Sequence, residues 1–217
     1  MIKFFLEGGF FMWPLLVCSV LSVAFVIERA IVHLKVRREE KLREIVQQAI
    51  SMVENGSDAK EITSFLDKTG GLVGETLWAA YERYTHIAEA ERSVEEKRRE
   101  LQDISFNAAR DYLRRNLGVL EFMTGGATLL GLLGTIQGMI MSFGAIAKAG
   151  VLGDPTIVAR GISVALHTTV TGLAIALFSM VFFYIYRGNA ERKTVRVEPY
   201  AFAFVDAVLK RTKSRAQ

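Results

Sequence analysis

Three long apolar stretches, separated by polar sequence, constrain the fold of this chain more than any other feature. They run from Phe10 to Leu34, from Leu120 to Ala147 and from Ile157 to Tyr186. A helix needs roughly 20 apolar residues to cross the hydrocarbon core of a bilayer, and each stretch is longer than that. The sequence therefore predicts an all-α integral membrane protein with three transmembrane helices.

The distribution of Lys and Arg predicts how these helices are oriented. Basic residues cluster after the first stretch, before the second and after the third, whereas only Lys3, Lys148 and Arg160 lie on the opposite side. Positively charged flanks stay in the cytoplasm, so we expect a periplasmic amino terminus and a cytoplasmic carboxyl terminus. The first stretch is too long for the core of a signal peptide and lacks a small-residue cleavage pattern, so we expect an uncleaved helix.

These features divide the chain into seven expected segments. The predicted order is a periplasmic amino terminus (1–9), transmembrane helix 1 (10–34), a cytoplasmic helical domain (35–117), transmembrane helix 2 (118–147), a periplasmic loop (148–156), transmembrane helix 3 (157–186) and a cytoplasmic tail (187–217). The tail is amphipathic with a basic end. We expect it to pack on the cytoplasmic domain or to contact anionic lipid.

Break signals predict several helices within the cytoplasmic domain. ENGSD (54–58) is expected to stop the first helix, and Asp58 with Glu61 predicts a capping pair for the second. KTGG (68–71) breaks the chain again before a third helix. From Glu89 there is neither Gly nor Pro until Gly118, so we expect a charged helix, supported by a pair between Glu95 and Arg99, to run unbroken into the second apolar stretch. We interpret its charges as a solvated face rather than a partner site.

Small and hydroxylated residues form a seam along each of the last two stretches. Steps of three or four residues read Thr, Thr, Gly, Thr, Gly, Ser, Ala, Ala from Thr124 to Ala149, and Gly, Ala, Thr, Gly, Ala, Ser from Gly161 to Ser179. Small residues let membrane helices approach closely, so the two seams predict that these helices face each other. The residues assigned to helix packing are Gly131, Gly134, Gly138, Gly161 and Gly172.

The hydroxyls in these seams, with Gln137 nearby, predict a wetted surface, although a threonine in a helix can also bond to the preceding turn. The side chains predicted to line a pore or proton pathway are Thr128, Thr135, Ser142, His167, Thr168 and Thr169. Two interpretations of His167 stay open. Packing, or a hydrogen bond made by the neutral ring, is favoured over proton carrying, which an imidazole can perform near neutral pH.

The chain has no carboxylate in the middle of any apolar stretch. Such a group costs roughly 2.5–3.5 kcal/mol on insertion scales and is kept there only for function. Glu28 and Glu121 lie toward the cytoplasmic ends of their stretches. If this chain lines a proton path, we therefore expect another polypeptide to supply the acid.

Other classes of chemistry find little support in the sequence. The single Cys18 excludes an intrachain disulfide, and three scattered histidines have no metal-ligand spacing. No nucleophile stands beside a base, no phosphate-binding loop is present, and the three unlike stretches lack the internal repeats of a carrier. We expect neither an enzyme nor a bound cofactor or metal.

Three blocks of sequence resemble one known family. GGFFMWPLLVCSVLSVAFVIER (8–29), LLGLLGTIQGMIMSF (129–143) and GISVALHTTVTGL (161–173) are similar to the three spans of the MotA/TolQ/ExbB proton channel family, most of all to its ExbB branch. The order of a short outer terminus, one span, a large cytoplasmic loop and two spans resembles ExbB and TolQ rather than the four-span MotA.

The resemblance implies a homopentamer in the bacterial inner membrane whose second and third spans line a central pore. It also implies an ExbD- or TolR-like single-span partner with a membrane aspartate, and a TonB- or TolA-like transducer driven by the proton-motive force. Thr135 and Thr169 match pore-facing threonines. The sequence departs from the enteric ExbB pattern at Val164, where that pattern has glutamate, and at Thr128, where proline is usual. A TolQ-like subunit for envelope maintenance and a passive membrane scaffold remain alternatives.

Overall fold

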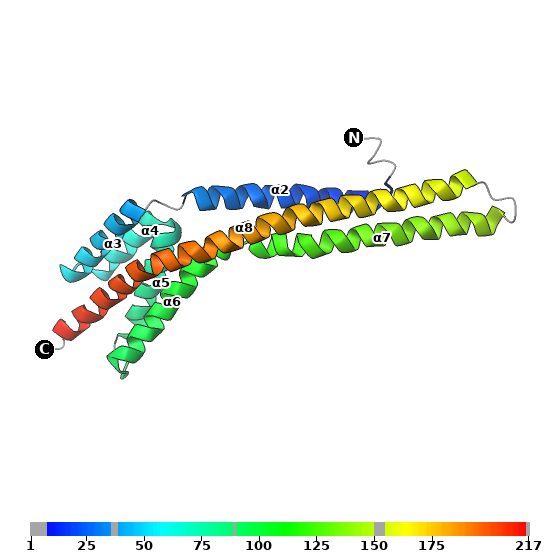
Figure 1. Ribbon diagram of the computed structural model, residues 1–217. Helices are drawn as coiled ribbons and strands as arrows, with labels where there is room; N and C mark the ends of the chain where they lie inside the picture. Colours follow the sequence, from blue (N-terminus) through cyan, green and yellow to red (C-terminus); the bar gives the residue numbers. More distant parts are fainter. Residues whose placement is uncertain (1–7, 36–38, 89, 150–154, 216–217) are drawn as a thin grey trace. The chain divides into compact units, whose positions relative to one another are not determined.

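The computed structural model describes residues 8–35, 39–88, 90–149 and 155–215, and every regular element within these ranges is a helix (Figure 1). The all-α prediction is therefore confirmed. Two compact units are present, one formed by Met1–Arg29 with Asn116–Ile185 and the other by Ala30–Arg115 with Tyr186–Gln217. The helices are α2 (Met12–Lys35), α3 (Glu39–Glu54), α4 (Ala59–Thr69), α5 (Gly71–Ile87), α6 (Val94–Arg114), α7 (Leu117–Ala149) and α8 (Pro155–Arg215).

Three helices are long and apolar enough to cross a membrane, as predicted. The qualifying segments are Met12–Lys35, Leu117–Ala147 and Val158–Arg211. The third span and the tail, which were predicted as separate segments, belong to the single helix α8, and no break separates them. The predicted periplasmic loop is also shorter, since α7 extends to Ala149 and α8 begins at Pro155, and 150–154 lie outside the described residues.

The first unit is a bundle of α2, α7 and the first part of α8, which lie side by side (Figure 1). Its buried cluster combines residues of all three helices, and the hydroxyls of Ser22 and Ser179 join α2 to α8 at 2.9 Å. The large apolar side chains on the outer surfaces of these helices stay exposed, as expected for helices that face lipid or another subunit. The members of the cluster are Met12, Leu15, Cys18, Met123, Ala127, Ile175 and Ala176.

The second unit packs α3, α4, α5, α6 and the last part of α8 around one main apolar core. The predicted breaks are confirmed: α3 ends at Glu54, and Gly70 and Gly71 adopt φ angles of 52° and 66° between α4 and α5. Glycine is favoured there because other side chains rarely take positive φ. Asp58 caps α4 as predicted, although its carboxylate accepts from the N–H of Ala59 at 2.8 Å.

The tail packs on this unit, which confirms the first of its two predicted contacts. Ala201, Phe204, Val205 and Val208 of α8 are buried against the other helices of the unit. The charged helix before the second span, in contrast, does not run unbroken. It ends at Arg114, and α7 begins only at Leu117.

The break between α6 and α7 has a local cause. Asn116 adopts φ 61°, which asparagine tolerates better than most residues, and its amide donates to the Glu28 carboxylate at 3.0 Å. The prediction of a continuous helix was wrong because it counted only Gly and Pro as breakers. The ion pair predicted between Glu95 and Arg99 is also replaced by another. Glu95 instead contacts Arg98 at 3.3 Å.

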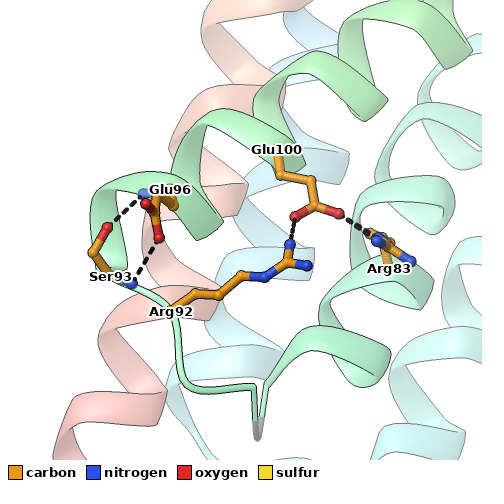
Figure 2. A network of polar contacts seen from close by, with 5 residues as sticks. All are labelled: Arg83, Arg92, Ser93, Glu96 and Glu100. Atoms are coloured by element: carbon orange, nitrogen blue, oxygen red, sulfur yellow. Dashed lines mark hydrogen bonds and ion pairs between the residues drawn. The ribbon is translucent and has the colours of Figure 1, made fainter.

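A polar network fixes the connection from α5 to α6 (Figure 2). The Glu100 carboxylate accepts from Arg83 at 2.6 Å and from Arg92 at 2.8 Å. These hydrogen bonds, with that from Arg83 contributing most, hold the pKa of Glu100 below its usual 4.5. Beside them, Ser93 and Glu96 form a reciprocal capping box at the start of α6.

Candidate functional site

The two seams meet in a close contact between α7 and α8. A Cβ atom added to Gly138 would lie 2.8 Å from the carbonyl oxygen of Gly161, and one added to Gly172 would lie 2.5 Å from that of Ala127. An added Cβ at Gly131 would lie 3.0 Å from the carbonyl oxygen of Thr168, and Gly134 and Gly161 are similarly crowded. Each of the five glycines assigned to packing therefore lies where the opposite helix leaves no room for a larger residue.

Two residues predicted to line a pore lie inside this contact instead. Thr168 is 1% exposed and Ser142 is 3% exposed. Their hydroxyls donate to the carbonyls of Ala165 at 2.8 Å and Gly138 at 2.9 Å. The prediction treated every hydroxyl of a seam as surface, whereas small hydroxylated side chains also fill helix contacts. We therefore assign Thr168 and Ser142 to packing.

Three threonines lie at the open edge of the same contact. Thr128 is exposed, and Thr135 and Thr169 are half-buried. Successive helical residues are about 100° apart, which places Thr128 and Thr135 on the flank of α7 away from Met123, a residue of the buried cluster with α2. On α8, Thr169 donates to the Gly131 carbonyl of α7 at 3.2 Å. The three hydroxyls thus follow one side of the α7–α8 pair, the side away from α2.

Each of these threonines donates its own hydroxyl hydrogen to a backbone carbonyl. The acceptors for Thr128 and Thr135 are the carbonyls of Thr124 at 3.0 Å and Leu132 at 2.6 Å. A hydroxyl oxygen keeps two lone pairs when its hydrogen is engaged. The threonine edge, defined as Thr128, Thr135 and Thr169, is therefore a row of hydrogen-bond acceptors.

His167 does not join the threonine edge, contrary to its predicted place in the same pathway. It precedes Thr169 by two residues, which separates the two side chains by about 160° around α8. Its Nδ1 lies 2.6 Å from the carbonyl oxygen of Ser163. Because a carbonyl can only accept, Nδ1 carries the hydrogen in this contact. Gln137 is likewise displaced from Thr135 and lines a separate cavity of about 570 Å³ with Arg160 and neighbouring residues.

Sequence reasoning missed one residue of the contact. Ala127 presents its carbonyl to Gly172 and is fully buried. The predicted seam included Thr124 and Thr128, and it therefore left out Ala127, the residue before Thr128. Its signal was present in the sequence, since Ala127, Gly131, Gly134 and Gly138 are small residues spaced by four, three and four.

The described parts of the three spans offer no internal acid for proton transfer. In residues 12–35, 117–147 and 158–186, the carboxylates are Glu28, which bonds to Arg29 and Asn116, and the exposed Glu121. Within the described residues there is also no cluster of three side chains able to hold a metal ion. The chemistry available at the threonine edge is hydrogen bonding.

Comparison with known proteins identifies the family. The sequence profile of the MotA/TolQ/ExbB proton channel family matches residues 74–199, a range that contains α7 and the contacting part of α8. The chain belongs to this family. The match includes the second and third of the sequence blocks that resembled it and confirms the resemblance.

Similar proteins support the same family assignment and its ExbB branch. The chain is 31% identical over 185 residues to the biopolymer transport protein ExbB-like 1 of Synechocystis, covering 82% of this chain and 67% of that protein. It is 29% identical over 139 residues to an ExbB homolog of Methanothermobacter thermautotrophicus (64% and 45%). It is also 29% identical over 174 residues to the biopolymer transport protein exbB1 of Vibrio cholerae (78% and 71%).

Proposed function

We propose that this chain is the pore-forming stator subunit of an ExbB/TolQ-like motor in the bacterial inner membrane, with its amino terminus in the periplasm and its carboxyl terminus in the cytoplasm. Five copies form a ring whose pore is lined by the threonine edges of α7 and α8. An ExbD/TolR-like single-span protein lies in the pore, and a TonB/TolA-like transducer carries the motion toward outer-membrane transport. The observation that carries the proposal is a continuous threonine edge, in a proton channel family member, without an acid of its own.

The hydroxyls of Thr135 and Thr169 serve the aspartate of the partner in both of its states. With their hydrogens on carbonyls, they accept a hydrogen bond from the protonated acid. After the proton leaves, rotation of a hydroxyl lets it donate to the carboxylate, which would otherwise be poorly solvated. The membrane potential contributes about 2.3 kcal/mol per charge per 100 mV, enough to bias a conformational step when several protons pass.

A TolQ-like subunit for envelope maintenance is the second candidate, because Val164 stands where the enteric ExbB pattern has glutamate. Val164 lines the cavity around Gln137 rather than the threonine edge. The two candidates share the ring and the proton path and differ in the transducer that they drive. A passive scaffold would share the helix contact alone.

Proton flux in liposomes tests the proposal. Native mass spectrometry of the chain, co-expressed with an ExbD/TolR-like protein, should give five copies with the partner. In vesicles with an imposed pH gradient and membrane potential, that complex should pass protons, and replacing the partner's membrane aspartate by asparagine should stop them. An assembled complex that passes no protons, or passes them equally without the aspartate, would favour the scaffold.

A further inference from the structure

An exposed face of α5 combines a large aromatic ring with two carboxylates. Glu75, Trp78 and Glu82 occupy positions i, i+3 and i+7, so their side chains share one side of the helix. Trp78 is 41% exposed, although Leu77 and Tyr81 beside it are buried. We name these three residues the acidic face. An indole that leaves this much apolar surface in water is typical of a contact with another protein.

An exposed face of α8, in the same unit, has the complementary composition. Arg192, Val195, Arg196 and Pro199 occupy positions i, i+3, i+4 and i+7, and all four are exposed. We name them the basic face. Val195 is 61% exposed. Of the large apolar side chains that the structure describes in 39–115 and 186–211, only Val195 and Trp78 are exposed.

Pro199 gives the basic face an additional acceptor. Proline has no backbone N–H, so Val195 lacks the hydrogen bond that its carbonyl would receive from residue 199 in a regular helix. An indole N–H is a donor without acceptor capacity. The indole of Trp78 therefore matches the helical turn from Val195 to Pro199 in two ways. Its ring can cover the exposed apolar surface of this turn, and its N–H can donate to the Val195 carbonyl.

The charges of both faces are available for a partner. Among the described residues, Glu75, Glu82, Arg192 and Arg196 take part in no ion pair, whereas nearby basic groups do: Arg114 contacts Glu191 at 2.6 Å, and Arg92 contacts Glu100 at 2.8 Å. Exposed charges without an ion-pair partner in their own chain can attract and orient a partner surface of opposite charge.

We propose that the acidic face of one copy of this chain docks on the basic face of the next copy. The Trp78 ring covers the helical turn from Val195 to Pro199, and its indole N–H donates to the free Val195 carbonyl. Glu75 and Glu82 form ion pairs with Arg192 and Arg196. A contact between two different patches of identical chains is head-to-tail, and it gives a closed ring when the rotation from one copy to the next closes. The inference rests on the proposed ring and adds a contact outside the membrane spans that fixes neighbouring subunits.

Carbodiimide cross-linking of two co-expressed copies tests this contact, because the reagent joins carboxylates to lysine amines and leaves guanidinium groups unreacted. One copy carries Glu75→Gln, Glu82→Gln, Arg192→Lys and Arg196→Lys, and the other is the natural chain. An amide between the 75–82 segment and position 192 or 196 can then form only between copies. We expect that amide in the covalent dimer by peptide mass spectrometry.

A matched variant separates docking from random reaction. In place of the changes at 192 and 196, it carries Arg110→Lys, at an exposed position of α6. We expect at least tenfold less amide to the 75–82 segment from this copy. Equal yields from both variants, or no amide at 192 and 196 in a ring that native mass spectrometry shows to be intact, would overturn the docking and leave the proposed function standing. Absence of a ring would overturn both.

Discussion

At the scale of single residues, the position of a hydroxyl around its helix decides its role. Thr168 and Thr169 are adjacent in sequence, yet the first is buried in the contact with α7 and the second lies at its edge. The sequence predicted that hydroxyls follow these helices. It could not separate the two kinds, because the separation depends on which residues of α7 approach α8. The threonine edge is therefore a property of the packed pair.

His167→Leu should leave the proton path intact. The imidazole lies on the far side of α8 from Thr169 and bonds to the Ser163 carbonyl in its own helix. Substitutions away from special contacts change free energies by about 0.5 kcal/mol, so we expect proton flux within about twofold of the natural chain. Flux measurements on reconstituted complexes check this. Complete loss of flux would show that His167 of this chain takes part in proton transfer.

Glu100→Gln should remove an acid-sensitive part of the stability of the second unit. The pKa of Glu100 is held below 4.5 in the folded chain, so its stabilising contribution is present above the pKa of the unfolded chain. That contribution is lost as the pH falls below about 4.5 through the lowered pKa. The thermal midpoints of the natural and Glu100→Gln chains, measured against pH in detergent, should differ near neutral pH and converge in acid.

Glu54→Gln provides the control for this titration, since Glu54 is exposed at the end of α3. Its midpoint near neutral pH should lie close to that of the natural chain. A Glu100→Gln chain that remains equally less stable in acid would show that the ionised carboxylate is not the stabilising form.

At the scale of elements, the contact between α7 and α8 was predictable and its neighbouring break was not. Small residues at steps of three and four along both helices predicted that α7 and α8 face each other, because close approach of two helices requires small residues in register. The end of α6 followed instead from one backbone angle at Asn116 and its bond to Glu28, a residue distant in sequence. Composition does not encode such a partner.

Gly138→Leu should weaken the first unit, and Gly134→Leu should act in the same direction. An added Cβ at Gly138 already meets the Gly161 backbone at 2.8 Å, where no flexible side chain can move aside. Overpacking of this kind costs about 1–3 kcal/mol. We expect a lower thermal midpoint in detergent and, because the proposed ring is built from this pair of helices, fewer intact rings in native mass spectrometry.

Gly125→Leu is the matched control, since an added Cβ at Gly125 meets nothing within 4 Å although the residue lies in the same helix. Leu177→Ala on the exposed surface of α8 gives a second comparison. Equal losses in Gly125→Leu and Gly138→Leu would contradict the packing role of Gly138.

At the scale of the whole molecule, the sequence blocks and apolar spans identified the family and the membrane class before any contact was known. The absence of a carboxylate from the middle of any apolar stretch led to the expectation that another chain supplies the acid of any proton path. What the sequence could not provide was the division between packing and edge residues, or the exposure of the acidic and basic faces of the second unit, because each depends on how the helices pack.

The account depends most on the hydroxyls of Thr135 and Thr169, and the variant Thr135→Val with Thr169→Val tests them directly because valine keeps the shape and removes the hydroxyl. The measurement is proton flux through reconstituted complexes whose five-copy assembly and bound partner have been verified, with the two serine substitutions as the conservative control. Hydrogen bonds to charged groups contribute about 1.5–3 kcal/mol, so we expect flux to fall at least about tenfold in the valine variant and to persist largely in the serine variant. Full flux in an assembled double-valine complex would contradict the account.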